Sequence, residues 1–255
     1  MDAKRIVVKV GSSTLTGDAG TSLNGSAVTK LVDVVANLKG QGKEVIIVTS
    51  AAIAAGMAPL GLTQRPTDLA TQQASASVGQ GLLIAKYSAE FTRHNIVASQ
   101  VLVTGDDLAR DLHKENAKRT LLRLLELGVV PIINENDSVG TEEIRLGDND
   151  RLAALVLQLI GADLLVLVSD IDALYDAPPT QAGANRIAKV TNFADLADIE
   201  IGGVGSSGVG SGGMVTKIQA AEIATSSGAR MLLTDLAHVE DALAGKDVGT
   251  LFTSN

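Results

Sequence analysis

Short runs rich in Val, Ile and Leu alternate along this chain with longer segments in which apolar residues recur every three or four positions. The first pattern predicts strands buried on both faces, and the second predicts amphipathic helices. The expected strands are residues 5–10, 44–49, 96–103, 129–134, 164–169 and 230–234. The expected helices are residues 24–40, 68–94, 114–127, 148–160 and 214–227. Because strands and helices alternate, we expect an α/β fold with a mostly parallel sheet covered on both faces.

Small and polar residues mark the ends of these elements. Gly128 and Gly161 directly follow apolar helical segments, where a left-handed cap is expected. Asp106 and Asp148 stand where side chains could cap the start of a helix. Residues 177–186 predict a surface excursion, and no linker, repeat or low-complexity tail divides the chain. We therefore expect a single domain.

The composition narrows the classes of protein that fit this pattern. The chain has 255 residues, of which 45% are hydrophobic and 2% aromatic, and its formal net charge is −8. Lysine and arginine form no basic stripe and few rings are present for base stacking, so we expect no binding to nucleic acid. The absence of cysteine excludes disulfides, cysteine nucleophiles and cysteine-based metal sites, and it fits a reducing compartment.

The apolar stretches are too short for membrane insertion. The first predicted strand is only about six residues long, which is less than the core of a signal peptide. The longest apolar stretch, residues 152–160, contains Gln158 and is far below the roughly 20 residues that span a bilayer. We expect a cytoplasmic protein with no membrane association.

Two small-residue turns, each with a lysine, carry the strongest chemical signal. In residues 202–213 (GGVGSSGVGSGG) seven of twelve residues are glycine, and Lys217 follows in the next helical turn. Consecutive amides at a helix N-terminus with a nearby lysine form a site for phosphate. A smaller version near the start places Lys9 in an apolar strand before Gly11, Ser12 and Ser13. Together these turns predict a nucleotide-dependent phosphoryl transferase.

Other interpretations of these features fit less well. Residues 203–208 match G-x-G-x-x-G, but further glycines follow and Glu222 falls inside the helix, which disfavours a dinucleotide-binding fold. The chain has no Walker A motif. A simple surface connection would explain the glycines but not the position of Lys217. Lys9 is either buried against a partner or on a solvated face, and the sequence leaves both open.

Two polar clusters follow predicted strands or open helices. One is residues 134–138 (NENDS), and the other is residues 147–151 (GDNDR). The carboxyl ends of strands are where open α/β sheets bind ligands. These groups could hold a substrate ammonium, orient a lysine or bind Mg²⁺, while helix capping and solvation explain part of them. His94, His113 and His238 have no metal-ligand spacing and are expected at exposed helix ends.

Seven segments in order along the chain resemble the amino acid kinase superfamily, and within it the glutamate 5-kinase family. They are IVVKVGSS near the start, VTSAAIAAG at 48–56, QRPTDLAT at 64–71, NENDSV at 134–139, LGDNDRLAA at 146–154, SDIDALYD at 169–176 and SGGMVTK at 211–217. NENDSV with LGDNDRLAA is the most specific pair, because related kinases for N-acetylglutamate, carbamate or UMP differ there.

The resemblance implies a three-layer α/β/α sandwich with an eight-stranded, mainly parallel sheet. Residues 1–167 would hold the amino acid and residues 168–255 the nucleotide. The implied reaction transfers the γ-phosphoryl group of ATP to the side-chain carboxylate of L-glutamate with Mg²⁺, as the first step of proline biosynthesis. It also implies a homodimer or homotetramer and feedback inhibition by proline, with residues 64–80 as a lid or inhibitor contact. Many relatives carry a C-terminal PUA domain, and this chain is expected to be a short form without one.

The resemblance also assigns roles to individual residues. Lys9 and Lys217 would neutralise the migrating phosphoryl group from two sides, and Asp150 would orient both lysines. The residues that match glutamate-holding positions are Ser50, Asp137 and Asn149. The residues that match nucleotide contacts are Lys9, Gly11, Ser12, Ser169, Asp170, Ser211, Gly212, Gly213, Met214, Val215, Thr216 and Lys217. No side chain is assigned as a metal ligand.

Three positions depart from the family pattern. Ala51 and Ala173 stand where relatives have glycine, and Ser211 stands where they have threonine. If residue 51 needs a positive φ, its methyl group costs about 1–2 kcal/mol and could crowd the substrate. Two alternatives therefore stay open: a related kinase acting on another carboxylate such as N-acetylglutamate, and a nucleotide-binding relative that has lost turnover.

Overall fold

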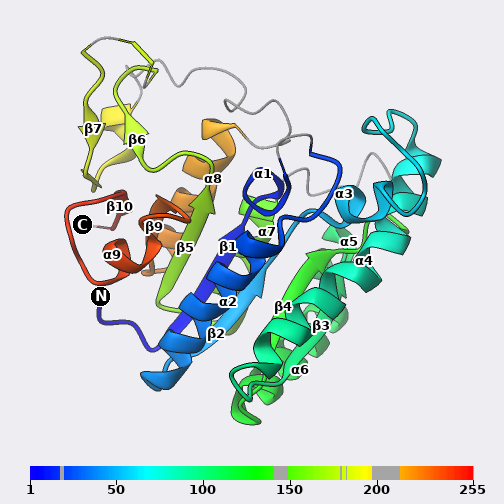
Figure 1. Ribbon diagram of the computed structural model, residues 1–255. Helices are drawn as coiled ribbons and strands as arrows, with labels where there is room; N and C mark the ends of the chain where they lie inside the picture. The colour runs from blue at the N-terminus through cyan, green and yellow to red at the C-terminus, as the bar shows by residue number, and fades with distance from the viewer. Residues whose placement is uncertain (18–19, 141–148, 179, 182, 197–212, 255) are drawn as a thin grey trace.

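A mainly parallel sheet forms the centre of the protein in the computed structural model (Figure 1), which describes residues 1–17, 20–140, 149–178, 180–181, 183–196 and 213–254. Its eight strands lie in the order β3-β4-β2-β1-β5-β9-β10-β8. Their bounds are β1 Arg5–Val10, β2 Glu44–Val48, β3 Ala98–Val103, β4 Val130–Glu135, β5 Leu164–Ser169, β8 Lys189–Val190, β9 Arg230–Asp235 and β10 Thr250–Phe252. Strand β10 runs antiparallel to β9, and the other pairings are parallel.

Strand β1 is the point in the sheet where the order of the strands reverses. Strand β1 pairs with β2 on one side and with β5 on the other. Because these three strands are parallel, the segments that follow them all begin at the same edge of the sheet. The segments after β2 and β5 lie on opposite sides of β1. In open α/β sheets, such a switch point is where ligands bind.

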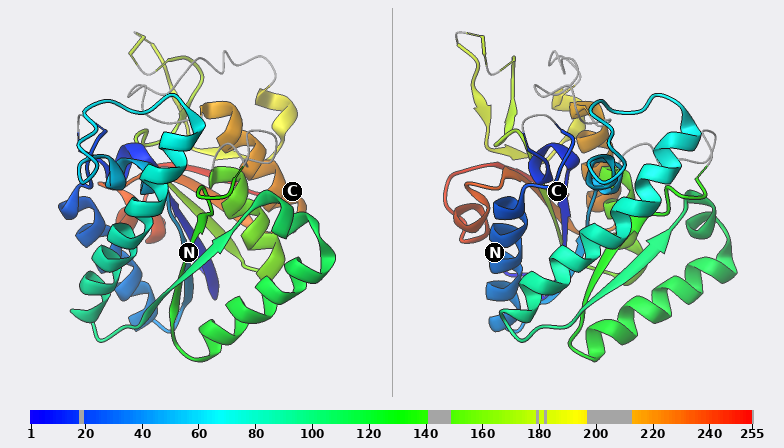
Figure 2. Two further views of the ribbon diagram at one scale, coloured as in Figure 1. Left: turned by 90° about the vertical axis from the view of Figure 1, so that its right-hand side faces the viewer. Right: turned by 45° about the vertical axis from the view of Figure 1, so that its right-hand side comes forward.

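Helices cover both faces of the sheet (Figure 2), as the alternation of apolar strands and amphipathic helices predicts. The helices are α1 Ser12–Leu15, α2 Gly25–Gly40, α3 Ala52–Met57, α4 Leu69–Thr92, α5 Gly105–Ala109, α6 Asp111–Glu126, α7 Asn149–Ile160, α8 Met214–Ser226 and α9 Val239–Leu243. None of the helices in the described part of the chain combines the length and apolar character that crossing a membrane requires.

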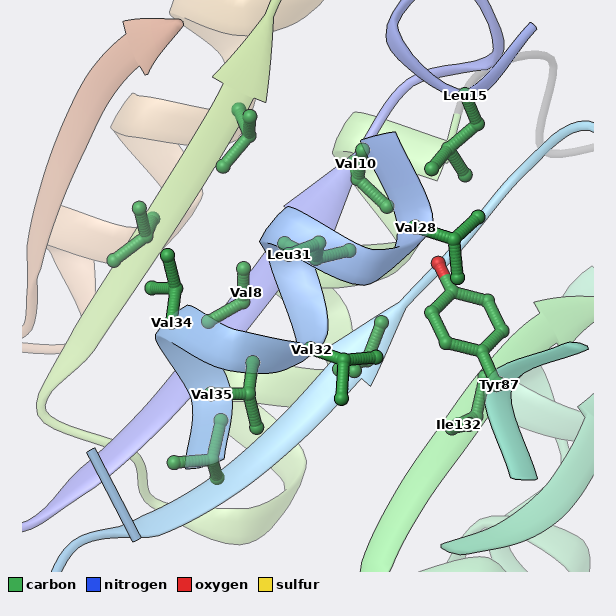
Figure 3. Packing of buried hydrophobic residues seen from close by; sticks show 14 of the residues in the cluster. Val8, Val10, Leu15, Val28, Leu31, Val32, Val34, Val35, Tyr87 and Ile132 are labelled. Carbon is green, nitrogen blue, oxygen red and sulfur yellow. The ribbon is translucent and has the colours of Figure 1, made fainter. Parts of the chain in front are cut away.

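Two apolar cores, one on each face, hold the three layers together. Val8 and Val10 of β1 pack against α2 (Figure 3), and Ile6 belongs to the same core, to which α4 and α9 also contribute. Val7 of the same strand packs on the opposite face with α7 and α8. Because side chains alternate along a strand, Lys9 belongs to the face of Val7, beneath α7 and α8.

Helices α3 and α4 cross at unusually close range. A Cβ on Gly79 of α4 would lie 1.8 Å from the carbonyl oxygen of Ala52, and a Cβ on Gly56 of α3 would lie 1.9 Å from that of Ser75. Only glycine fits at these two positions, because any Cβ would overlap backbone atoms. The start of α3 is therefore held firmly against the middle of α4.

The predicted strands and helices are confirmed with small shifts at their ends, and so are the left-handed caps at Gly128 and Gly161, with φ of 75° and 61°. The prediction of Asp106 as a cap is wrong. Thr104 caps α5 instead, because its hydroxyl accepts from the Asp107 N–H while the Asp107 carboxylate accepts from Thr104. Asp148 lies outside the described residues.

Short strands in the last third were not predicted. Strand β6 (Leu174–Tyr175) pairs antiparallel with β7 (Arg186–Ile187), so the expected excursion at 177–186 is the connection of a hairpin. This hairpin projects beyond the sheet (Figure 2). Strands β8 and β10 complete the main sheet with two and three residues. Runs this short show no measurable period in the sequence.

Candidate active site

Lys9 is buried, with 5% of its surface exposed, although it lies in the middle of an apolar strand. It pairs in register with Val48 of β2 and Leu167 of β5, so it occupies the switch point of the sheet. The strand alternation directs it toward α7 and α8. Of the two positions that the sequence left open, the structure shows the buried one.

Asp150, in the first turn of α7, binds two lysines that are far apart in the chain. Its Oδ1 lies 2.5 Å from the Nζ of Lys9, and its Oδ2 lies 3.1 Å from the Nζ of Lys217 in α8. Asp150 is fully buried and Lys217 is 6% exposed. Both ammonium groups therefore meet on one carboxylate, the arrangement that the predicted role of Asp150 requires.

The electrostatics of this triad keep the carboxylate ionised. Burial alone would raise the pKa of Asp150, but the charges of Lys9 and Lys217 and their hydrogen bonds outweigh it and hold that pKa well below its usual range. One carboxylate faces two ammonium groups, so the three side chains carry a net charge of +1. Clustered positive side chains attract anionic ligands.

The start of α8 adds polar groups to the triad. The Thr216 hydroxyl lies 3.2 Å from Oδ2 of Asp150 and 2.8 Å from the carbonyl of Gly213, the residue that precedes the helix. Met214 is partly buried and Val215 is 54% exposed. Ser211 and Gly212, like most of the glycine-rich run, lie outside the described residues. A helix N-terminus therefore faces the same point as the two lysines.

The turns after β1 and β5 lie at the same edge of the sheet. A Cβ on Gly11 would be 3.6 Å from the Nζ of Lys9, so the backbone of this turn passes close to the ammonium group. Ser12 begins the short helix α1 and is partly exposed. After β5, the hydroxyl of buried Ser169 donates to the carboxylate of exposed Asp170 at 3.0 Å.

A second cluster of amides and hydroxyls surrounds Asn149, the residue before Asp150. Its Nδ2 lies 2.5 Å from the carbonyl of Thr49, 2.8 Å from Oδ1 of Asn134 and 3.0 Å from the hydroxyl of Ser50. The ends of β2 and β4 and the start of α7 therefore meet at one side chain. Two of the predicted glutamate-binding residues, Ser50 and Asn149, are brought together here.

Asn134 opens the polar cluster NENDS, but the sequence pattern assigned it no role of its own. It is 3% exposed, and among the described residues its Nδ2 has no hydrogen-bond partner. An orphaned buried donor costs free energy unless a ligand or water accepts from it. Asp137 lies three residues further on, partly buried in the turn that follows β4.

Ala51 has a φ of 78°, a left-handed conformation at the start of α3. The condition under which the methyl group of this residue is costly, a positive φ, is therefore met. The other departure, Ala173, is 1% exposed and precedes β6. Residues 64–80 form the approach to α4 and its first half, with the Asp68 carboxylate accepting from the Thr71 N–H at 2.8 Å.

The three histidines lie near helix ends, as predicted, but only His113 and His238 are exposed, and His94 is partly buried. Each is paired with an aspartate: His94 with Asp33 at 2.7 Å, His113 with Asp107 at 2.9 Å, and His238 with Asp235 at 2.8 Å. In the part of the chain that the structure describes, no group of three or more His, Asp or Glu side chains could hold a metal ion.

The sequence profile of the amino acid kinase family matches residues 4–235. A protein of Streptomyces coelicolor named glutamate 5-kinase is 57% identical over 98% of this chain and 67% of its own length. A protein of Clavibacter michiganensis with the same name is 54% identical over 98% of this chain and 94% of its own.

Solved structures with the same fold are more distant in sequence. Carbamate kinase from Giardia lamblia bound to AMP-PNP superposes with a TM-score of 0.70 at 16% identity, covering 99% of both chains. UMP kinase from Bacillus anthracis gives 0.65 at 14% identity, covering 99% of this chain and 97% of the other. These likenesses confirm the predicted three-layer architecture with its eight-stranded, mainly parallel sheet.

Proposed function

The chain belongs to the amino acid kinase family, and from that premise we propose that it transfers the γ-phosphoryl group of ATP to the side-chain carboxylate of L-glutamate. The product is L-glutamyl 5-phosphate, an acyl phosphate that opens proline biosynthesis. The observation that carries the proposal is the buried triad, in which Lys9 and Lys217 converge on Asp150 from distant parts of the chain.

The reaction requires little covalent chemistry from the protein. A glutamate carboxylate is ionised at neutral pH, so it attacks the γ-phosphorus without a general base. The new carboxylate O–P bond forms as the bond from phosphorus to the β–γ bridging oxygen breaks, and ADP leaves with that oxygen. Catalysis then consists of holding two anions in line and stabilising the charge that shifts between them.

The triad supplies that stabilisation. Lys9 and Lys217 neutralise the migrating phosphoryl group from two sides, and Asp150 acts as a positioning residue that holds both ammonium groups. Because these groups are fixed before the nucleotide binds, they need not reorganise during the reaction. The positive charges of the two lysines complement the negative charge of the phosphates.

We propose that ATP binds to the protein as its magnesium complex. Mg²⁺ commonly binds through substrate phosphates and keeps several waters, which fits a site whose buried carboxylate is already engaged by two lysines. When bound, the ion neutralises phosphate charge. The residues proposed to hold the nucleotide are Lys9, Gly11, Ser12, Ser169, Asp170, Ser211, Gly212, Gly213, Met214, Val215, Thr216 and Lys217.

The cluster around Asn149 is the proposed acceptor site. Ser50 and Asn149 offer a hydroxyl and an amide, the orphaned Nδ2 of Asn134 offers a donor, and Asp137 offers a carboxylate for the α-ammonium group. This site adjoins the triad, because Asn149 and Asp150 are consecutive in α7. Residues 1–167 would therefore carry the amino acid and residues 168–255 most of the nucleotide.

A trapping assay tests the function directly. The protein is incubated with Mg-ATP and either L-glutamate, N-acetylglutamate or other carboxylic acids, and any acyl phosphate is captured with hydroxylamine. A coloured hydroxamate with glutamate alone is the expected result. Product with N-acetylglutamate and none with glutamate would assign another acceptor, and ATP binding without ADP release would contradict an enzyme.

We also propose that the protein acts in the cytoplasm, that proline inhibits it and that it forms a homo-oligomer. Proline shares the ammonium and α-carboxylate of glutamate, so it would compete at or near the acceptor site, with residues 64–80 as the nearby lid or contact. We expect a homodimer or homotetramer. Replacing Asp68 and Thr71 by alanine should weaken proline inhibition, and an unchanged inhibition constant would remove this segment from the inhibitor site.

A further inference from the structure

Three polar side chains on α4 are spaced seven residues apart: Gln73, Gln80 and Tyr87. Seven residues make about two helical turns, so the three lie along one side of the helix. Tyr87 and Gln80 bond segments of the proposed acceptor site, and Gln73 bonds the chain that follows it after β4. Gln80 is 7% exposed and Tyr87 is fully buried, so these bonds are largely shielded from water.

Tyr87 reaches the end of β2. Its hydroxyl lies 3.0 Å from the hydroxyl of Thr49, whose carbonyl accepts from Asn149 at 2.5 Å. Figure 3 shows the Tyr87 ring close to Val32 and Ile132 in the apolar core. Burial raises the pKa of Tyr87, so its hydroxyl keeps its proton. Thr49 therefore links the core to Asn149, because its hydroxyl bonds Tyr87 and its carbonyl accepts from Asn149.

Gln80 reaches the end of β4. Its Nε2 donates to the carbonyl of Glu135 at 3.2 Å, while the N–H of Glu135 donates to Oδ1 of Asn134 at 2.9 Å. Both backbone groups of Glu135, its N–H and its carbonyl, are therefore hydrogen-bonded to side chains. In the segment that follows β4, the carbonyl of Gly140 accepts from the Nε2 of Gln73 at 3.0 Å.

Helix α4 can serve as a rigid support for these bonds. At Gly79 the backbones of α4 and α3 are in such close contact that no side chain fits between them, and α3 begins two residues after Ser50. The segments at Thr49–Ser50 and Asn134–Glu135, and through them Asn149, are thus positioned by one helix. None of the three side chains of α4 contacts the lysine triad through a described bond.

We propose that Gln73, Gln80 and Tyr87 are positioning residues that set the affinity of the acceptor site for glutamate, an inference that rests on the proposed function. They fix the ends of β2 and β4 in the arrangement that places Ser50, Asn134 and Asn149 around one ligand. Loss of a bond lets the acceptor site relax while the phosphate site keeps its geometry. The kinetic consequence is confined to the Michaelis constant for glutamate.

Two conservative substitutions test the inference on separate bonds. Gln80→Met keeps the length of the side chain and removes the donor, and Tyr87→Phe removes only the hydroxyl. We expect each to raise the KM for glutamate about three- to tenfold, the effect of one net hydrogen bond. The KM for ATP and kcat should stay within about twofold. Calorimetric titration with glutamate should show the same weakening.

Gln158→Met is the matched control, because Gln158 donates to the carbonyl of Ile223 at 3.1 Å between α7 and α8, away from the acceptor site. It should leave all constants unchanged. An unaltered KM for glutamate in both α4 variants would overturn the inference. So would equal changes in both Michaelis constants and kcat, which would indicate general loosening. If the unmodified protein forms no hydroxamate with glutamate, the proposed function itself fails.

Discussion

Lys9 lies between Val8 and Val10 in β1, and both neighbours are fully buried. An isolated ammonium group in such a place would cost several kcal/mol, about what charge burial costs in proteins. Asp150 offsets this cost by direct pairing, and the same pairing brings in Lys217. The centre of the sheet therefore tolerates the charge of Lys9 because Asp150, a residue far away in the sequence, pairs with it.

Removing either lysine should reduce turnover strongly. We expect Lys9→Ala and Lys217→Ala each to lower kcat by about 10²–10³, the usual effect of deleting one preorganised charge donor. Steady-state kinetics with Mg-ATP and glutamate measure this. Lys246→Ala, which removes an exposed lysine paired with Asp241 at 2.8 Å, serves as the control. Normal turnover in both site variants would eliminate the mechanism.

Ala51 offers a test of backbone strain at a single residue. Its left-handed φ of 78° costs an alanine about 1–2 kcal/mol, and glycine avoids this at an entropic cost of about 0.4–1 kcal/mol. We expect Ala51→Gly to raise the free energy of unfolding by about 0.5–1 kcal/mol and Tm by about 1–4 °C. Calorimetry measures the shift. Ala55→Gly, in the helical interior of α3, should lower Tm instead.

At the scale of elements, the crossing of α3 and α4 sets the geometry of the acceptor side. Helix α4 has 24 residues and its glycines have different surroundings. Gly79 faces the backbone of α3 at contact distance, whereas a Cβ on Gly81 would have no heavy atom of another part of the protein within 4 Å. One helix thus carries a glycine that the packing requires and another that it does not.

These two glycines form a matched pair for mutation. Gly79→Ala should lower the free energy of unfolding by about 3 kcal/mol or more, because a Cβ at 1.8 Å from the Ala52 carbonyl forces the helices apart. Gly81→Ala should raise it by up to about 1 kcal/mol through helix propensity. Urea denaturation compares both with the unmodified protein. Equal effects would show that α3 and α4 do not pack as described.

At the scale of the whole molecule, Asp150 joins three distant parts of the chain. It lies at the start of α7, while its partners lie in β1 and at the start of α8. A buried pair that loses one member is destabilised by about 3–5 kcal/mol, since the remaining charges are left uncompensated. The triad therefore contributes to the cohesion of the fold as well as to the proposed chemistry.

Asp150→Asn should lower the free energy of unfolding by about 3–5 kcal/mol near neutral pH and reduce kcat. The pKa of Asp150 is lowered in the folded state, so its contribution is complete above the unfolded value of about 4 and is lost as pH falls below it. The stability difference from the unmodified protein should therefore be constant from pH 8 to 5 and shrink below about 4. Urea titrations across pH measure it. A difference that grew on acidification would contradict the lowered pKa.

Much of the architecture is encoded locally, and the errors have local causes. Strands such as β1 and β5 are continuous apolar runs, so their positions follow from hydrophobicity alone. Strands β8 and β10 are two and three residues long and form only because the rest of the sheet presents an edge to them. Asp106 had the chemistry of a cap, but α5 begins earlier than expected, so Thr104 occupies the cap position and Asp106 lies inside the first turn.

The sequence by itself determined the order of the longer strands and helices, the turns rich in small residues and the charged residues that stand in or beside those turns. These follow from period, composition and side-chain chemistry, which are properties of neighbouring residues. Only the tertiary structure decided that Lys9 is buried, that Lys217 meets it on Asp150, and that Gln73, Gln80 and Tyr87 support the acceptor side. Such contacts depend on how strands pair and helices cross, and no local pattern records which distant side chains those crossings bring within bonding distance.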